Sequence, residues 1–77
     1  MNEIICNPKI LGGKPIIKGT RISVELILEL LSSGMNVDQI LEDYPHLKKD
    51  DILAAVSYAA KTIKHEEILF MNKPIKV

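Results

Sequence analysis

Aromatic residues are scarce in this chain. It contains no tryptophan, and its aromatic side chains are Tyr44, Tyr58 and Phe70. Proteins that bind single-stranded nucleic acid commonly stack the bases on exposed aromatic rings. With so few rings, base stacking is not expected as a binding mode. The hydrophobic core has to be built from isoleucine, leucine and valine instead.

Cysteine and long apolar runs are also nearly absent. Cys6 is the single cysteine, which excludes an internal disulfide and a zinc site built from cysteines. No apolar run approaches the ~20 residues that a membrane-spanning helix needs, and the N-terminus lacks the basic start of a signal peptide. We therefore expect a cytoplasmic protein that has no membrane segment and no cofactor.

The chain has no net charge, but its charges are unevenly placed. Ten basic residues balance ten acidic ones. Residues 1–24 carry four basic residues and one acid (+3), residues 25–51 two and seven (−5), and residues 52–77 four and two (+2). Phosphate binding depends on clustered positive charge. The zero balance argues against nucleic-acid binding, whereas the two basic ends leave it open.

The remaining composition is typical of one small domain. With 77 residues and 47% hydrophobic content, the chain is too apolar for disorder and too short for a large core. Domains of this size often gain stability by pairing, so a homodimer is expected. We predict a single domain over residues 1–77, divided into a β-hairpin arm (4–22), a three-helix bundle (23–67) and a short tail (68–77).

The arm has the pattern of a short hairpin. Lys9-Ile10-Leu11 and Pro15-Ile16-Ile17 flank the glycine-containing turn Gly12-Gly13-Lys14, and this predicts two strands. Pro15 has no N–H group, so the second strand is expected to begin there. Gly19 is expected to end it.

The first two helices are predicted from their caps. Ser23 is a suitable N-cap for a helix over residues 24–32, and Gly34 can take the left-handed conformation that ends it. Asn36 and Gln39 have the spacing of a capping box at the start of a second helix. That helix is expected to end by Tyr44, because the next residue is a proline.

The third helix is predicted to begin near Lys48, where Leu47 and Ile52 have the spacing of a hydrophobic staple. Asp50 and Asp51 suit the positive end of its dipole. Its expected inner face holds Ile52, Val56, Ala59 and Ile63, and its expected outer face holds Asp50, Ala54, Ser57 and Lys61.

Basic residues of the arm and of the third helix are candidates for contacts with nucleic acid. An arginine can hold a phosphate through two hydrogen bonds, and lysines can follow the backbone. Lysines on an edge strand also have a structural role, because they prevent edge-to-edge aggregation. On the third helix, Asp50 and Asp51 would repel phosphates. The candidates are Lys14, Lys18, Arg21, Lys48, Lys49 and Lys61.

The tail is apolar at first and then basic. The run Ile68–Met71 is too short for a membrane span. Two alternatives are open for this run: it closes the core as a strand, or it binds a partner protein. Small domains commonly need both a closed core and a partner for stability. The candidates for contact with a protein partner are Leu69, Phe70, Met71 and Lys73.

No set of groups suited to catalysis can be assembled from the sequence. His46 and His65 lack metal-ligand spacing, and Cys6 has no motif around it. The adjacent acids Glu42-Asp43 and Asp50-Asp51 point about 100° apart on a helix and do not converge. We therefore expect a binding protein and not an enzyme.

Three segments, in this order and spacing, resemble the bacterial family of unknown function numbered 433. They are GGKPIIKGTRI, GMNVDQILEDYPHL and DDILAAVSYAA. The motif positions are matched by Gly12, Gly13, Lys14, Pro15, Gly19, Thr20 and Arg21, by Tyr44, Pro45 and Leu47, and by Tyr58, Ala59 and Ala60. Where the family commonly has serine or threonine as the cap of the third helix, this chain has Lys48, which is expected to lose the cap bond at a cost of about 1 kcal/mol.

The resemblance implies a mainly α domain of helix-turn-helix type, preceded by β structure. It also implies an antitoxin-like role, in which the chain neutralises a PIN-like ribonuclease by direct binding and binds promoter DNA as a dimer. Two alternatives stay open. One is a stand-alone DNA-binding transcriptional regulator, and the other is a homodimeric interaction module that binds no nucleic acid.

Overall fold

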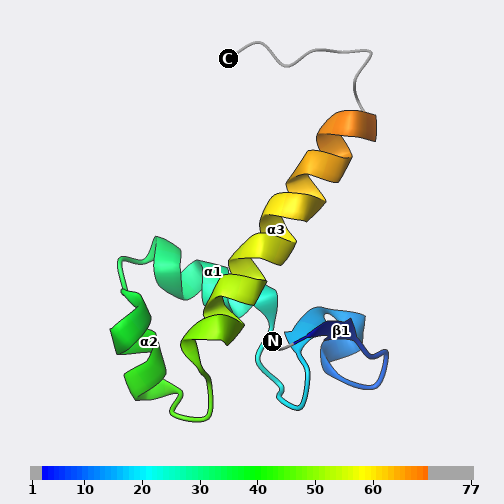
Figure 1. Cartoon of the computed structure of the whole chain (residues 1–77). Coiled ribbons are helices and arrows are strands. Elements are labelled where there is room, and N and C mark those ends of the chain that lie inside the picture. The colour runs from blue at the N-terminus through cyan, green and yellow to red at the C-terminus, as the bar shows by residue number, and fades with distance from the viewer. Residues whose placement is uncertain (1–2, 70–77) are drawn as a thin grey trace.

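The fold consists of three helices preceded by a small β-hairpin, as predicted (Figure 1). A computed structural model describes the backbone of residues 3–69 and the side chains of residues 3–65. The elements are β1 (Ile4–Cys6), the 3-10 helix η1 (Leu11–Gly13), β2 (Pro15–Ile17), α1 (Val24–Ser32), α2 (Val37–Asp43) and α3 (Lys49–Leu69). The hairpin, α1, α2 and the start of α3 form a body from which the rest of α3 projects (Figure 1).

The first strand of the hairpin lies earlier than predicted. β1 pairs antiparallel with β2, so that Ile4 lies opposite Ile17, and the predicted strand over residues 9–11 was wrong. The backbone explains the difference, because the N–H of Ile10 donates to the carbonyl of Asn7 at 2.9 Å and so closes a turn. Leu11 has a φ of 50°, which a strand does not accommodate. The predicted start of the second strand at Pro15 is confirmed.

The predicted caps of α1 and α2 are confirmed. The Ser23 hydroxyl accepts the backbone N–H of Leu26 at 2.9 Å, and Gly34 has a φ of 102° just after α1. Asn36 and Gln39 each accept the other's backbone N–H at 2.9 Å. These bonds satisfy donors that the first turn of a helix leaves unpaired, which is why the sequence located both helices.

The core lies where the three helices meet β2, and it is aliphatic as predicted. Tyr44 and Tyr58 pack against its margin. Its buried members are Ile17, Ile22, Val24, Ile27, Ile40, Leu47, Ile52 and Ala55.

The buried side of α3 differs from the predicted one. Ile52 and Ala55 are fully buried, whereas Val56 and Ile63, both assigned to the inner face, are 41% and 57% exposed. Tyr58 also packs against the core. Because Tyr58 follows Val56 in the helix and is covered, the core-facing side of α3 is turned toward Ala55 and Tyr58 and away from Val56. The later turns of α3 project from the body (Figure 1), and residues 60–65 are exposed. α3 also continues to Leu69, two residues past the predicted end of the bundle.

Candidate binding surfaces

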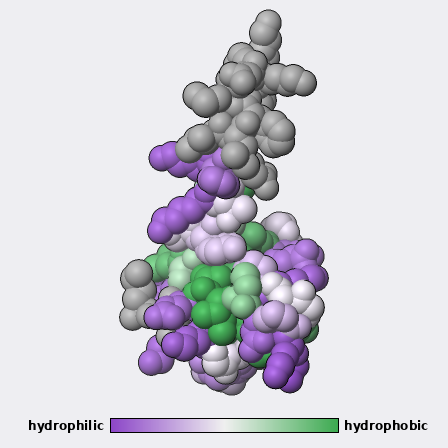
Figure 2. Space-filling view, turned by 90° about the vertical axis from the view of Figure 1, so that its right-hand side faces the viewer, coloured by the Kyte–Doolittle hydropathy of each residue, from purple (hydrophilic) through white to green (hydrophobic). Residues whose placement is uncertain are grey.

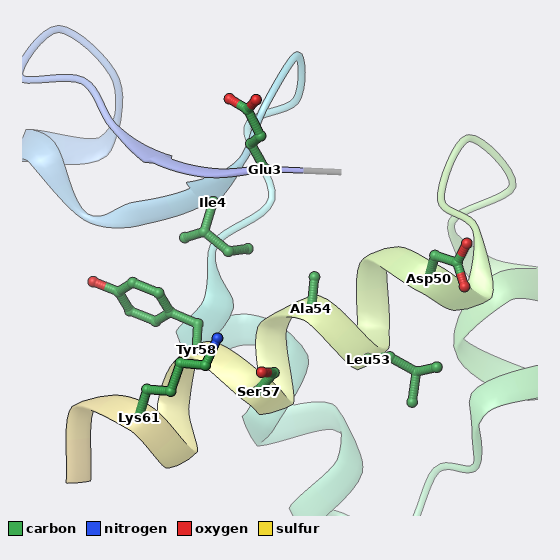
Figure 3. A pocket seen from close by; sticks show the side chains of 8 residues that line it. All are labelled: Glu3, Ile4, Asp50, Leu53, Ala54, Ser57, Tyr58 and Lys61. Carbon is green, nitrogen blue, oxygen red and sulfur yellow. The ribbon is translucent and has the colours of Figure 1, made fainter. Parts of the chain in front are cut away.

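A cleft of about 730 Å³ lies between β1 and α3. Ile4 points from the strand toward the helix, and the ring of Tyr58 lies beneath the strand (Figure 3). Glu3, Asp50 and Lys61 add charges to a lining that is otherwise mostly apolar. An apolar centre with a charged rim has the anatomy of a protein-binding surface.

A second groove, of about 480 Å³, lies between α1 and the middle of α3. Its apolar lining includes Val24 and Leu28 of α1 and Ile63 of α3, and Glu25 and Glu29 also line it. Seen from the side at the right of Figure 1, the body exposes a hydrophobic patch bordered by hydrophilic residues, and α3 rises above it (Figure 2). An apolar groove bordered by charged residues is a candidate surface for contact with other macromolecules.

Two of the basic candidates in the arm are engaged with acids. The Lys14 ammonium donates to a carboxylate oxygen of Glu25 at 2.7 Å, and the Lys18 ammonium lies 3.6 Å from a carboxylate oxygen of Glu3. The hydrogen bond to Glu25 and the negative charge of that carboxylate raise the pKa of Lys14. Because each lysine has an acid at its side, a phosphate approaching either of them meets a partly neutralised surface.

The other basic candidates are exposed, and the two within α3 do not share a face of that helix. Arg21, Lys48, Lys49 and Lys61 are all exposed. Lys49 and Lys61 stand 12 positions apart in α3, which corresponds to about 18 Å along the helix and about 120° around it. The two basic candidates within α3 therefore lie on different sides of that helix.

The candidates for a protein partner lie at the far end of α3 and beyond it. Leu69 is the last residue of that helix. Phe70, Met71 and Lys73 lie outside the described residues.

The sequence-based reasoning missed the role of Asp51. Its side chain is 2% exposed, and one carboxylate oxygen accepts the backbone N–H of Lys48 at 2.8 Å. This is the second half of a capping box, in which the residue three positions after the cap reaches back to it. The sequence did contain a signal for this bond, because Asp51 stands three residues after the expected cap, Lys48. The start of α3 is thus capped although Lys48 provides no cap from its own side chain.

Within residues 3–69, no helix is both long and apolar enough to cross a bilayer. The same part of the chain contains no group of three or more His, Cys, Asp or Glu side chains placed to hold a metal ion.

Comparison with known proteins gives two matches of different kinds. The chain is 36% identical over 72 residues to the uncharacterized protein y4eO of Sinorhizobium fredii (strain NBRC 101917 / NGR234), covering 92% of this chain and 33% of the relative. The chain thus spans about a third of the length of that relative. No solved structure matches this chain significantly. The model of a family described as "protein of unknown function (DUF433)" matches residues 4–59. This chain is a member of the DUF433 family.

Proposed function

We propose that this chain is an antitoxin-like binding protein of the cytoplasm, which neutralises a partner PIN-like ribonuclease by direct contact. The observation that carries the proposal is the projecting part of α3. Between Ser57 and His65 it holds two lysines, Lys61 and Lys64, ahead of the two acids Glu66 and Glu67, and both lysines are exposed. A nuclease that binds metal ions has an acidic cleft, and complementary charge favours the encounter of two proteins.

The mechanism is occlusion without any chemical step. Lys61 and Lys64, which precede Glu66 and Glu67 in α3, approach the acidic cleft and take the place of the RNA phosphates. Leu69, Phe70 and Met71 supply apolar anchors further along the chain, and Lys73 a further cation. Buried apolar and aromatic anchors contribute most of the affinity of such interfaces, whereas charges at the rim mainly set specificity and the association rate.

Co-purification with the protein encoded beside it tests the proposal. We expect the two proteins to elute together and the nuclease to be inhibited. Reversing two charges, with Lys61→Glu and Lys73→Glu, should weaken binding by about tenfold or more, because attraction becomes repulsion at both positions. Lys9→Glu is the matched control, since Lys9 is exposed and lies on the arm. Separate elution of the two wild-type proteins, with full nuclease activity, would contradict the proposal.

A second candidate function, DNA binding, is favoured by the exposed cations near the start of α3. In a helix-turn-helix interpretation of α2 and α3, the latter enters the major groove. Lys48 and Lys49 are exposed at the start of α3, and Arg21 is exposed on the arm. Either a dimeric antitoxin that binds its own promoter or a stand-alone regulator would use these residues.

A gel-shift assay with the upstream DNA separates this candidate from a homodimeric module that binds no nucleic acid. With three phosphate contacts, a fourfold rise in salt should weaken binding by about 40-fold. At constant salt, Arg21→Ala and Lys49→Ala should each weaken the binding of DNA. Lys14→Ala should have less effect on that affinity, because Lys14 is paired with Glu25. An affinity that is independent of salt would exclude phosphate contacts.

A further inference from the structure

The exposed apolar residues of α3 form a regular row. Of the four large hydrophobic side chains that stand out as exposed in the described part of the chain, three lie on this helix. Leu53 is 52% exposed, Val56 41% and Ile63 57%, and the exposed Ala60 lies between the last two. The intervals from Leu53 to Ile63 are three, four and three residues, which is the spacing of a coiled-coil seam. We call these four residues the α3 seam.

We propose that the α3 seam is the interface for a second copy of this chain, with the two α3 helices running antiparallel. The inference goes beyond the proposed function and does not depend on a nuclease. The seam extends for about 15 Å, or ten residues at 1.5 Å each. A row repeating every 3.5 residues stays on one side of two helices that wind around each other.

The order of residues in the seam makes it complementary to itself. When two copies are related by a two-fold axis near residue 58, Leu53 lies opposite Ile63 of the second copy and Val56 lies opposite its Ala60. Each small residue then meets a larger one, so the helices can approach evenly. A parallel pair would instead set Ala60 against Ala60 and leave a gap in the packing. Closed two-fold pairs require this kind of self-complementary patch.

The charges beside the seam favour the same direction. Asp50, Ser57 and Lys64 are spaced seven residues apart and follow one edge of the seam. In an antiparallel pair like edges face each other, so Asp50 lies opposite Lys64 of the second copy at both ends. All three residues are exposed. In a parallel pair Asp50 would instead stand level with Asp50. Opposite charges flanking a helical seam determine partner and orientation.

The shape of the molecule agrees with this direction. The later turns of α3 project from the body (Figure 1). In an antiparallel pair each projecting end lies beside the body of the second copy, which adds contact area to a short seam. Lys61 remains accessible to a further partner, because it lies about 120° around the helix from the centre of the seam, whereas Lys64 pairs with Asp50 of the second copy.

The mass of the purified full-length chain in solution, measured by light scattering without any partner, tests the interface. We expect twice the monomer mass of 8.6 kDa at high concentration. Leu53→Glu should weaken the dimer at least about tenfold, because a carboxylate then faces Ile63 of the second copy. Its helical circular dichroism should not change, since residue 53 is half-exposed. Leu11→Glu is the matched control, because Leu11 is 45% exposed and lies outside α3.

A charge exchange tests the antiparallel direction. Asp50→Lys and Lys64→Asp should each weaken the dimer about tenfold, and the double variant should restore it. A monomer at every concentration, or a dimer that Leu53→Glu leaves intact, would overturn the interface. A double variant as weak as the single ones would overturn the antiparallel pairing. None of these measurements involves the nuclease or DNA, so their failure leaves the proposed function standing.

Discussion

Replacing Ile27 by alanine is expected to remove about 3 kcal/mol of folding stability, the largest effect of any change considered for this molecule. Ile27 is fully buried and lies in α1, the helix that packs on both α3 and β2. The change loses the transfer free energy of the deleted groups and leaves a cavity that rigid neighbours fill only partly. A domain of 77 residues has a total stability of about 4–12 kcal/mol. The substitution therefore removes a large share of the total folding stability.

Chemical denaturation followed by circular dichroism measures this loss. Ile27→Val removes a single methylene group and should cost about 1 kcal/mol, which gives a graded series at one site. Ser32→Ala, at an exposed position of the same helix, should change the stability by less than about 0.5 kcal/mol. If Ile27→Ala cost no more than Ser32→Ala, the packing of α1 in this core would be incorrect.

Replacing Asp51 by alanine is expected to cost about 2 kcal/mol, the second largest effect. The buried carboxylate of Asp51 accepts the N–H of Lys48, so its removal leaves that donor without its partner in the capping turn. It also removes a negative charge from the positive end of the α3 dipole. A sequence with lysine at the cap position depends on this one bond for the start of its longest helix.

Two further substitutions separate the hydrogen bond from the charge. Asp51→Asn keeps an oxygen acceptor and loses the charge, so it should cost less than Asp51→Ala. Asp50→Ala removes a neighbouring charge from the same turn, but Asp50 is exposed, and the loss should stay below about 1 kcal/mol. Equal losses for Asp50→Ala and Asp51→Ala in denaturation experiments would mean that the bond to Lys48 contributes nothing.

Local signals allowed much of the fold to be predicted from the sequence. Helix caps and left-handed turns involve contacts between residues at most four positions apart, so the sequence alone indicates them. The residues that provided these signals are Ser23, Gly34, Asn36 and Gln39. The first strand escaped prediction because pairing with β2 is not local. Ile4 pairs with Ile17, and the positive φ angle of Leu11 is incompatible with the strand expected over residues 9–11.

The binding surfaces were less predictable, because they depend on which side of a helix meets its neighbours. Helical spacing alone placed Val56 and Ile63 on the same stripe as Ile52. In the structure the core-facing side of α3 runs through Ile52, Ala55 and Tyr58 and leaves Val56 and Ile63 exposed. The ion pair of Lys14 and Glu25 joins residues 11 positions apart, so no local pattern in the sequence indicated it.

The burial gradient along α3 gives its two ends different resistance to opening. Ile52 and Ala55 are fixed in the core near its start, whereas every residue from Ala60 to His65 is exposed. Unwinding the later turns removes few contacts and therefore requires less free energy than unfolding the body. Amide protons near Ile52 are then exchanged with solvent only when the whole domain unfolds, while those past Ala60 exchange through local fraying.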